Sequence, residues 1–356
     1  MDQQLTIAVS GLQAACSPAP GIEVAWCLAQ DPAIRIVGVD YDPLCTGLYS
    51  IPAPFCATAC LPSPADWSAF TDPFQRFCHE YNVSIFIPST DLDVLLLADH
   101  LSDLYAMNLR CLIPMKNVLD RVGKANLFTQ TQIGGAFNLP WTILLYSSDD
   151  MERLSSIEYP VCIKGRLSGA HPARSSEEAR QYALQFASMS GWPVMIQEWI
   201  TGEEYSITSL ADTQHNIIGG AAMKKVGITE DGSTWAGVTI QGSDLIVRLQ
   251  EFLHECEWVG PIDIDISKTG DDRVFLLDVN ARFPSWVGVA LEAEVNLPLL
   301  LVEYLNANAS PKNSQAWARS GLAFAQYIDD MSIGLELWLK NQIGAASEQK
   351  GFYRYI

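Results

Sequence analysis

Acidic side chains recur at alternate positions in one segment of the chain, residues 260–282. The segment predicts two strands, residues 262–268 and 273–279, joined by a turn of one threonine, one glycine and two aspartates. In the first strand Asp263 and Asp265 alternate with isoleucines. Because alternate side chains of a strand lie on the same face, we expect both carboxylates on one side and the isoleucines on the other.

The end of the second strand adds further polar groups to this hairpin. Asp278, Asn280 and Arg282 share one face by the same alternation. If the strands pair, Asp265, Asp278 and Asn280 could converge as oxygen ligands for Mg²⁺. Arg282 would then lie beside them to bind a phosphate. The alternative is a solvated hairpin face with ordinary charges, but oxygen ligands clustered beside a guanidinium favour the metal site.

The composition is typical of a folded protein of two or three domains, with 356 residues, 49% hydrophobic and 18% charged. We expect a cytoplasmic protein without a membrane partner, because no apolar run could cross a bilayer and the first residues do not resemble a signal peptide. The net charge of −19 argues against a nucleic-acid partner. Nine cysteines, an odd number, suggest reduced thiols, and the close pair Cys56 and Cys60 is interpreted as incidental.

The N-terminal part predicts a doubly wound α/β unit. Its predicted elements are strand 5–9, helix 22–30, strand 34–43, helix 67–82, strand 83–89, one helix over 92–108 and strand 109–114. The first loop lacks G-x-G-x-x-G, which disfavours a dinucleotide-binding oxidoreductase. Asp91 and Asp93 follow a strand at the edge where open α/β sheets bind ligands. Capping of the next helix is the favoured alternative for them.

Basic residues are few, 22 in total, so their positions are informative. A helix from residue 116 carries Arg121 and Lys124 at i and i+3, which are interpreted as solvated charges unless a ligand lies nearby. A predicted strand ends in Lys164, before a loop of small residues, 165–173, which suits a lid whose backbone amides close over phosphates. His171 in this loop could touch a substrate, although a solvated loop histidine is the favoured interpretation.

Taken in order, these motifs resemble those of the ATP-grasp superfamily, in the branch of the carbamoyl-phosphate synthase large subunit, biotin carboxylase and small carboxylate–amine ligases. The most specific match is GPIDID followed by FLLDVNARF, which resembles G-P-I-N-I-Q … E-I-N-P-R-F. The resemblance implies that Asp265, Asp278 and Asn280 bind the metal and that Arg282 binds phosphate. Aspartates replace the usual longer Glu or Gln, and Ala281 replaces the usual proline.

Two further motifs fit the same family. YPVCIKGRLSGA resembles the P-x-x-x-K-P strand and its lid, which implies that Lys164 reaches the nucleotide phosphates and that Ser168 and Gly169 lie in the lid over them. QEWITGEEYS by itself predicts a hairpin, and it resembles the family's hinge, with Glu204 on the ribose. The resemblance assigns Glu198, Trp199 and Ile200 to the adenine, and Gln197 is also predicted to bind the nucleotide.

For two of the predicted phosphate-binding basic residues, the sequence offers two nearby candidates each. DRVGK resembles the helix that carries the first nucleotide-binding basic residue, for which we choose Lys124 over Arg121. Lys225 lies where many family members contact the reacting phosphate, and Lys224 is an equal candidate by spacing. The catalytic residues are therefore predicted to be Lys164, Lys225 and Arg282.

The resemblance implies an α/β fold with a Rossmann-like domain at 1–113, a two-part ATP-grasp domain at 114–308 with its lid near 130–200, and an extension at 309–356 that packs on the grasp core. The implied function is an ATP-dependent, ADP-forming carboxylate–amine ligase that acts through an acyl phosphate on an amino acid or peptide-like substrate. ATP and Mg²⁺, with Mn²⁺ as a substitute, are the expected cofactors, small carboxylates and amines the partners, and a homodimer is common in the family. Alternatives are a modifier of a ribosomal peptide or pathway intermediate and a non-catalytic ATP-binding regulator.

Overall fold

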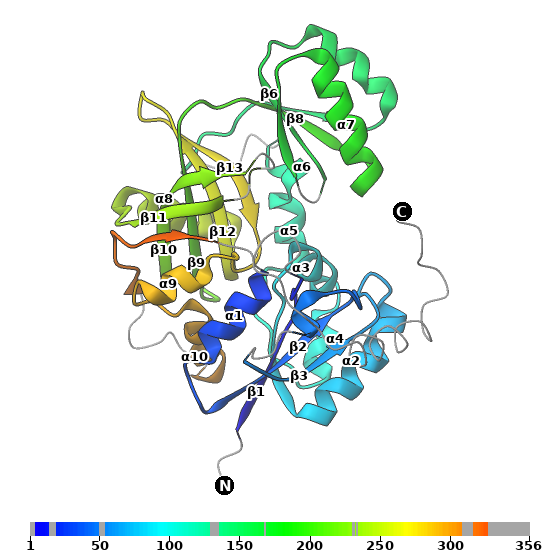
Figure 1. The fold of residues 1–356 in the computed structure, drawn as a ribbon, viewed down its shortest axis with the longest axis vertical. Helices are drawn as coiled ribbons and strands as arrows, with labels where there is room; N and C mark the ends of the chain where they lie inside the picture. The colour runs from blue at the N-terminus through cyan, green and yellow to red at the C-terminus, as the bar shows by residue number, and fades with distance from the viewer. Residues whose placement is uncertain are drawn as a thin grey trace.

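The computed structural model describes residues 4–13, 19–49, 54–128, 135–166, 169–229, 232, 234–307 and 316–326. Within these ranges the strands form three sheets. We call them the N-terminal sheet (β1 to β4), the small sheet (β5 to β8) and the large sheet (β9 to β15). Figure 1 shows the small sheet at the top of the molecule, the large sheet at the left and the N-terminal sheet at the bottom.

The N-terminal sheet has four parallel strands in the order β3-β2-β1-β4. The elements of this part are β1 (Leu5–Val9), α1 (Pro20–Leu28), β2 (Ile34–Asp40), the 3-10 helix η1 (Thr46–Leu48), β3 (Phe55–Cys60), α2 (Trp67–Tyr81), β4 (Val83–Ile87), α3 (Asp91–Ala98) and α4 (Leu101–Ala106). The apolar runs of β1, β2 and β4 are largely buried, as expected for a parallel sheet covered on both faces. From β1 the chain runs to β2 and β3 on one side, and it then crosses to β4 on the other side of β1. In open α/β sheets, ligands bind at the point where the strand order reverses in this way.

Two predictions for this part are wrong, and one strand was missed. Residues 92–108 form two helices instead of one, because the chain turns at His100, whose ring stacks on Trp67 with the centroids 3.9 Å apart. Residues 109–114 contribute a single bridge, from Arg110 to Ile85, instead of a strand. Strand β3 was not predicted, because it lies at the sheet edge and its partly exposed side chains lack the apolar run of a buried strand.

The small sheet is antiparallel, in the order β5-β8-β6-β7. The elements of this part are β5 (Thr142–Leu145), η2 (Ser148–Ser156), β6 (Val161–Lys164), β7 (Ala170–Ala173), α7 (Ser176–Ser190) and β8 (Val194–Glu198). The predicted cap of α7 is confirmed, because the Ser175 side chain accepts a hydrogen bond from the Glu178 amide at 3.2 Å. Part of the expected loop 165–173 is a strand, β7, which pairs with β6.

The large sheet has the order β13-β12-β9-β10-β11-β15, with β14 beside β10. Its strands are β9 (Glu203–Ala211), β10 (Ile217–Ile228), β11 (Thr234–Ile240), β12 (Gly260–Lys268), β13 (Val274–Asn280), β14 (Ala316–Trp317) and β15 (Ala323–Ala325). The helices of this part are α5 (Lys116–Val122), α6 (Lys124–Leu127), α8 (Ser243–Cys256), α9 (Val287–Glu292) and α10 (Leu297–Ala307).

The single helix expected from residue 116 is therefore interrupted at Gly123. The predicted hairpin of residues 262–279 is confirmed as β12 and β13. The other predicted hairpin is wrong, because β8 belongs to the small sheet and β9 to the large one.

Packing joins the N-terminal and large sheets but sets the small sheet apart. One buried cluster runs from Phe70 and Phe86 on the N-terminal side through Phe252 of α8 to Ile264 of β12. The small sheet has its own cluster, which includes Phe186. We therefore expect the small sheet to be the part that moves most easily.

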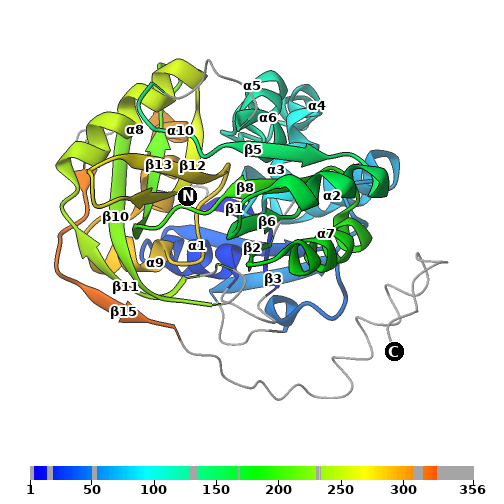
Figure 2. The ribbon, with the colours of Figure 1, turned by 90° about the horizontal axis from the view of Figure 1, so that it is seen from above.

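Figure 2 shows β15 along the outer edge of the large sheet, beside β11. The rest of the predicted extension, including the amphipathic stretch at 335–343, lies outside the described residues, apart from 316–326. No helix in the described part of the chain is both long and apolar enough to span a membrane.

Candidate active site

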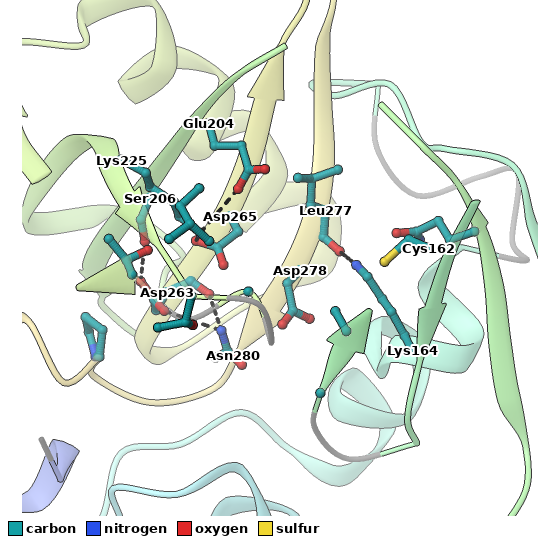
Figure 3. A pocket seen from close by; sticks show the side chains of 18 of the residues that line it. Cys162, Lys164, Glu204, Ser206, Lys225, Asp263, Asp265, Leu277, Asp278 and Asn280 are labelled. Atoms are coloured by element: carbon teal, nitrogen blue, oxygen red, sulfur yellow. Dashed lines mark hydrogen bonds and ion pairs between the residues drawn. The ribbon is translucent and has the colours of Figure 1, made fainter. Parts of the chain in front are cut away.

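A cavity of about 490 Å³ lies where the three sheets approach one another. Twelve of the predicted site residues line it: Lys164, Gly169, Gln197, Glu198, Trp199, Ile200, Glu204, Lys225, Asp265, Asp278, Asn280 and Arg282. Two further predicted residues cannot be placed relative to the cavity, because Ser168 and the side chain of Lys124 lie outside the described part of the chain. Figure 3 shows the carboxylates of Glu204, Asp263, Asp265 and Asp278 on the large sheet, with Lys164 reaching toward Leu277 from the small sheet.

Strand pairing places the predicted metal ligands opposite each other. Asp265 on β12 is the register partner of Asp278 on β13, and Asp263 is the partner of Asn280. β12 also pairs with β9, so it is an inner strand of the sheet, and its isoleucines are fully buried. The alternation read from the sequence therefore turns the polar side chains of β12 toward the cavity.

Lys225 lies in the cavity, close to two acidic side chains. Its Nζ is 2.9 Å from Oδ1 of Asp265 and 3.8 Å from Oε2 of Glu204, and the residue is 8% exposed. Burial alone would lower the pKa of Lys225, but Asp265 and Glu204 outweigh it and raise that pKa. For the acidic Glu204, burial has the opposite effect and raises the pKa. Lys224 pairs with Glu203, and of the two lysines only Lys225 lines the cavity.

Arg282 is held by acidic residues from two parts of the chain. Its Nε is 3.4 Å from Oδ2 of Asp91, at the start of α3, and its Nη1 is 3.6 Å from Oδ2 of Asp263. The other Asp91 oxygen accepts a hydrogen bond from the Ala281 amide at 3.1 Å. Burial alone would lower the pKa of Arg282, but these carboxylates more than offset it, so the pKa is raised.

The favoured interpretation of Asp91 and Asp93 as helix caps is wrong. Thr90 is the N-cap of α3, and its hydroxyl accepts the hydrogen bond from the Asp93 amide at 3.1 Å. Asp93 is buried, and its carboxylate accepts a 2.6 Å hydrogen bond from the Ser10 hydroxyl. Asp91 is instead part of the cavity wall.

Asp263 lies in the cavity wall, largely buried, where it contacts three polar side chains. One carboxylate oxygen accepts from the Ser206 hydroxyl at 3.0 Å, and the other accepts from Nδ2 of Asn280 at 3.3 Å and is near Arg282. Burial, followed by repulsion from Asp265, raises the pKa of Asp263 to about 7, against the lowering effect of Arg282 and Lys225. Asp263 was not assigned a role from the sequence, although its place on the face of Asp265 was apparent.

Lys164 bridges the small and large sheets. Its Nζ donates a 2.6 Å hydrogen bond to the backbone carbonyl of Leu277 on β13, and it lies 5.6 Å from the centre of the Phe128 ring. The residue is 9% exposed. Figure 3 shows its side chain extending from the end of β6 toward β13. The charge at the end of β6 is therefore directed into the cavity.

The segment that connects the small sheet to the large sheet forms one wall of the cavity. Gln197 donates to the Thr142 hydroxyl at 3.2 Å, and Glu198 accepts from the Trp141 amide at 3.1 Å, so both side chains are fixed to β5 and the residue before it. Trp199 is 42% exposed and lines the cavity with Ile200. Aromatic and aliphatic surface with few polar groups is what a flat base requires.

Two residues considered from the sequence are not in the cavity wall. The Arg121 guanidinium donates to the backbone carbonyl of Cys256, and Arg121 does not line the cavity. His171 is on β7, and its ring stacks on Tyr182 at 4.7 Å and lies 5.7 Å from Phe186. The interpretation of His171 as a solvated loop residue is therefore wrong, because it packs against α7.

The donor set suits a magnesium ion that binds together with a nucleotide. The Asn280 amide nitrogen donates to Asp263, which leaves its carbonyl oxygen available beside the carboxylates of Asp265 and Asp278. Oδ1 of Asp265 lies 2.9 Å from the Lys225 ammonium. In the described residues no group of three or more His, Cys, Asp or Glu side chains forms a complete metal site. Two carboxylates and an amide would leave the other positions of Mg²⁺ to phosphate oxygens and water.

No family model and no curated protein matches this sequence. The structure of an L-amino acid ligase from Bacillus licheniformis matches 86% of this chain and 75% of its own, with a TM-score of 0.62 and 13% identity. The biotin carboxylase domain of Hydrogenobacter thermophilus 2-oxoglutarate carboxylase, crystallised as a dimer with MgADP, ADP and bicarbonate, matches over 88% and 72%, with a TM-score of 0.64 and 12% identity. N5-carboxyaminoimidazole synthetase from Staphylococcus aureus matches over 87% and 79%, with a TM-score of 0.61 and 12% identity.

These similarities establish the fold. The chain has the mixed α/β fold of these ATP-grasp ligases, with a parallel sheet, an antiparallel sheet and a largely antiparallel one, which confirms the predicted fold class and, for the fold alone, the resemblance. The division at residues 113 and 308 stays a prediction. At such low identity the chemistry has to be argued from this chain's own residues.

Proposed function

We propose that this protein is an ATP-dependent, ADP-forming carboxylate–amine ligase. In this reaction the γ-phosphate of ATP is transferred to a carboxylate, and an amine then displaces phosphate from the acyl phosphate to form an amide. The observation that carries the proposal is that Lys164, Lys225 and Arg282 line one cavity with the oxygen donors Asp265 and Asp278. Phosphoryl transfer depends mainly on positioning and charge neutralisation, which these groups supply.

Lys164 is placed to couple nucleotide binding to movement of the small sheet. Its hydrogen bond to the Leu277 carbonyl joins the two sheets across the cavity, and a phosphate oxygen there would offer a stronger, charged acceptor. Binding would therefore draw the small sheet onto the nucleotide. Exclusion of water by this closure would protect an acyl phosphate, which hydrolyses readily.

Lys225 and Arg282 supply fixed positive charge on the large sheet. The raised pKa of Lys225 keeps its ammonium protonated at neutral pH. Asp91 and Asp263 hold the Arg282 guanidinium in one orientation, so little reorganisation is needed when charge develops on a transferred phosphate. Mg²⁺ bound by Asp265, Asp278 and Asn280 would neutralise further phosphate charge.

For the substrates we favour an amino acid or a small peptide-like carboxylate, joined to a small amine. Support comes from the fold shared with an L-amino acid ligase, at an identity too low to transfer its specificity. The cavity wall beyond the phosphate residues includes Asp91 and Trp286, which offer one acidic and one aromatic surface for a substrate. The cytoplasmic location, the homodimer and Mn²⁺ as a substitute metal stay predictions.

The test is ADP release from ATP in a screen of paired carboxylates and amines, with mass spectrometry of the products. Once a pair is active, Lys164→Ala and Asp278→Ala should abolish ADP release and leave the circular dichroism spectrum unchanged. Arg273→Ala is the control, because Arg273 is exposed on the turn of the same hairpin and pairs only with Asp271 and the Phe275 ring among its described contacts. Near-normal turnover in either site variant would refute the proposal. Nucleotide binding without turnover of any pair would favour an ATP-binding regulator.

A further inference from the structure

Asp263 is a buried acidic residue for which the proposed reaction has no direct use. It is 5% exposed and lies two residues before Asp265 on β12, on the same strand face. Its two oxygens accept or face the polar groups of Ser206, Asn280 and Arg282. A buried carboxylate is costly to keep in a protein unless its partners satisfy it, so its surroundings indicate what it does.

The contact with Asn280 decides which end of that amide faces the cavity. An asparagine amide has a donor end and an acceptor end, and only the carbonyl oxygen can bind a cation. Nδ2 of Asn280 donates to the Asp263 carboxylate at 3.3 Å. The oxygen end is therefore directed away from Asp263, and no rotation of the amide retains this hydrogen bond while reversing the two ends.

Two further contacts fix Asp263 itself. The Ser206 hydroxyl on β9 donates to one oxygen at 3.0 Å, and this serine is 2% exposed. Arg282 lies 3.6 Å from the other oxygen and is also held by Asp91. Asp263 consequently connects a rigid inner strand to one predicted metal ligand and to the predicted phosphate arginine.

We propose that Asp263 is a positioning residue, which orients the Asn280 amide so that its oxygen serves as a ligand for Mg²⁺. This inference rests on the proposed function, since it assumes that a divalent cation binds at Asp265, Asp278 and Asn280. Partners behind metal ligands typically change metal affinity by about 10- to 100-fold when they are removed.

The test uses two substitutions and their combination. The first removes the contact that orients the Asn280 amide, and the second replaces the amide by a group that needs no orientation. Asp263→Ala removes the carboxylate acceptor of the amide and leaves only the more distant backbone carbonyl of residue 263, 3.5 Å from Nδ2 of Asn280. Asn280→Asp replaces the amide by a carboxylate, which has two equivalent oxygens and needs no orientation. In the unaltered background the new carboxylate would lie beside Asp263, and like charges at this distance repel. In the Asp263→Ala background the same change meets no such charge.

The measurement is the affinity for a non-hydrolysable ATP analogue by calorimetry, with and without MgCl₂, on the full chain. We expect Asp263→Ala to reduce the gain in affinity from MgCl₂ by about tenfold, with little change in the metal-free affinity. Asn280→Asp should weaken the gain in the unaltered protein and restore it in Asp263→Ala. Asp271→Ala is the control, because Asp271 is exposed on the turn of the same hairpin, and it should behave as the unaltered protein.

The outcomes separate this inference from the proposed function. If Asp263→Ala retains the full gain, or loses affinity equally with and without MgCl₂, the positioning role is wrong while the ligase proposal stands. The role is also wrong if Asn280→Asp weakens both backgrounds alike. If the unaltered protein gains no affinity from MgCl₂, both the magnesium site and this inference fail.

Discussion

Adjacent lysines on β10 show how one residue step decides which side chain enters the cavity. Lys225 is buried against Asp265, whereas the neighbouring Lys224 is on the opposite face with Glu203. Because side chains alternate along a strand, only one of the two can enter the cavity. The sequence did not say which, since both lysines have the same spacing to the motifs around them.

We expect Lys225→Ala to lower the rate of ADP release by about a hundredfold or more, a typical loss for a preorganised group that stabilises transferred charge. Lys224→Ala should stay within about twofold, because surface ion pairs contribute little. Steady-state kinetics of the two variants with the active substrate pair makes the comparison. Equal losses in the two variants would contradict the placement of Lys225.

Asp93 provides a residue-scale prediction about stability. Burial, as the main cause, raises its pKa from 3.8 to about 6. The folded state then binds the proton more tightly than the unfolded state, so this carboxyl favours folding below the unfolded pKa and loses that contribution as pH rises toward the folded pKa. Between pH 5 and pH 7 the free energy of unfolding should fall by about 1 kcal/mol through this group.

The measurement is urea unfolding at both pH values for the unaltered protein and Asp93→Asn, which has no proton to release. The difference in unfolding free energy between the two proteins should change with pH in the stated direction. Ser10, whose hydroxyl donates to Asp93, keeps a possible partner in the variant. A difference that is the same at both pH values would show that the Asp93 pKa is not raised.

At the scale of elements, the crossing from β8 to β9 depends on a glycine. A Cβ placed on Gly202 would lie 2.5 Å from the Lys268 carbonyl oxygen and 2.5 Å from Oγ of Ser267, both on β12. The backbone must therefore approach the end of β12 closely as it passes between the sheets. This close approach positions the residues of the predicted adenine wall, which lie directly before it.

Gly202→Ala should lower the free energy of unfolding by about 1–3 kcal/mol, because the new methyl group meets backbone that cannot easily yield. Gly270→Ala is the matched control, since a Cβ on Gly270 has no atom within 4 Å. Thermal unfolding of both variants measures the contrast. If the two substitutions lower the free energy of unfolding equally little, the approach of residue 202 to β12 is looser than described.

Elements could be predicted where local sequence carries the signal. The hairpin of β12 and β13 follows from alternation of aspartates and isoleucines, and the cap of α7 follows from Ser175. The separation of β8 and β9 into two sheets could not be predicted, because a strand, a short turn and a strand look the same whether or not they pair. Asp91 was placed at the ligand-binding edge but interpreted as a helix cap, because its contact with Arg282 spans 191 positions in sequence and depends on tertiary packing.

At the scale of the whole molecule, the cavity brings basic and acidic side chains together in a strongly acidic protein. The chain has 22 basic and 41 acidic residues, and Lys164, Lys225 and Arg282 line one cavity with six of the acidic residues. Each of them is held by a carboxylate or a carbonyl of the large sheet. A polyanion with a divalent cation could therefore replace internal partners, and this exchange should tie the small sheet, with its separate core, to the rest of the molecule.

The last prediction follows from this exchange. A non-hydrolysable ATP analogue with MgCl₂ should stabilise the protein by about 2.7 kcal/mol at a hundredfold excess over its Kd, since a ligand of the folded state adds its binding free energy to folding. The shift should also slow proteolysis within the small sheet, because Lys164 would bind both the sheet and the nucleotide. Thermal unfolding and limited proteolysis, each with analogue alone, MgCl₂ alone and both, are the measurements. Lys164→Ala should lose the protection of the small sheet, whereas protection by MgCl₂ alone would place the effect elsewhere in the molecule.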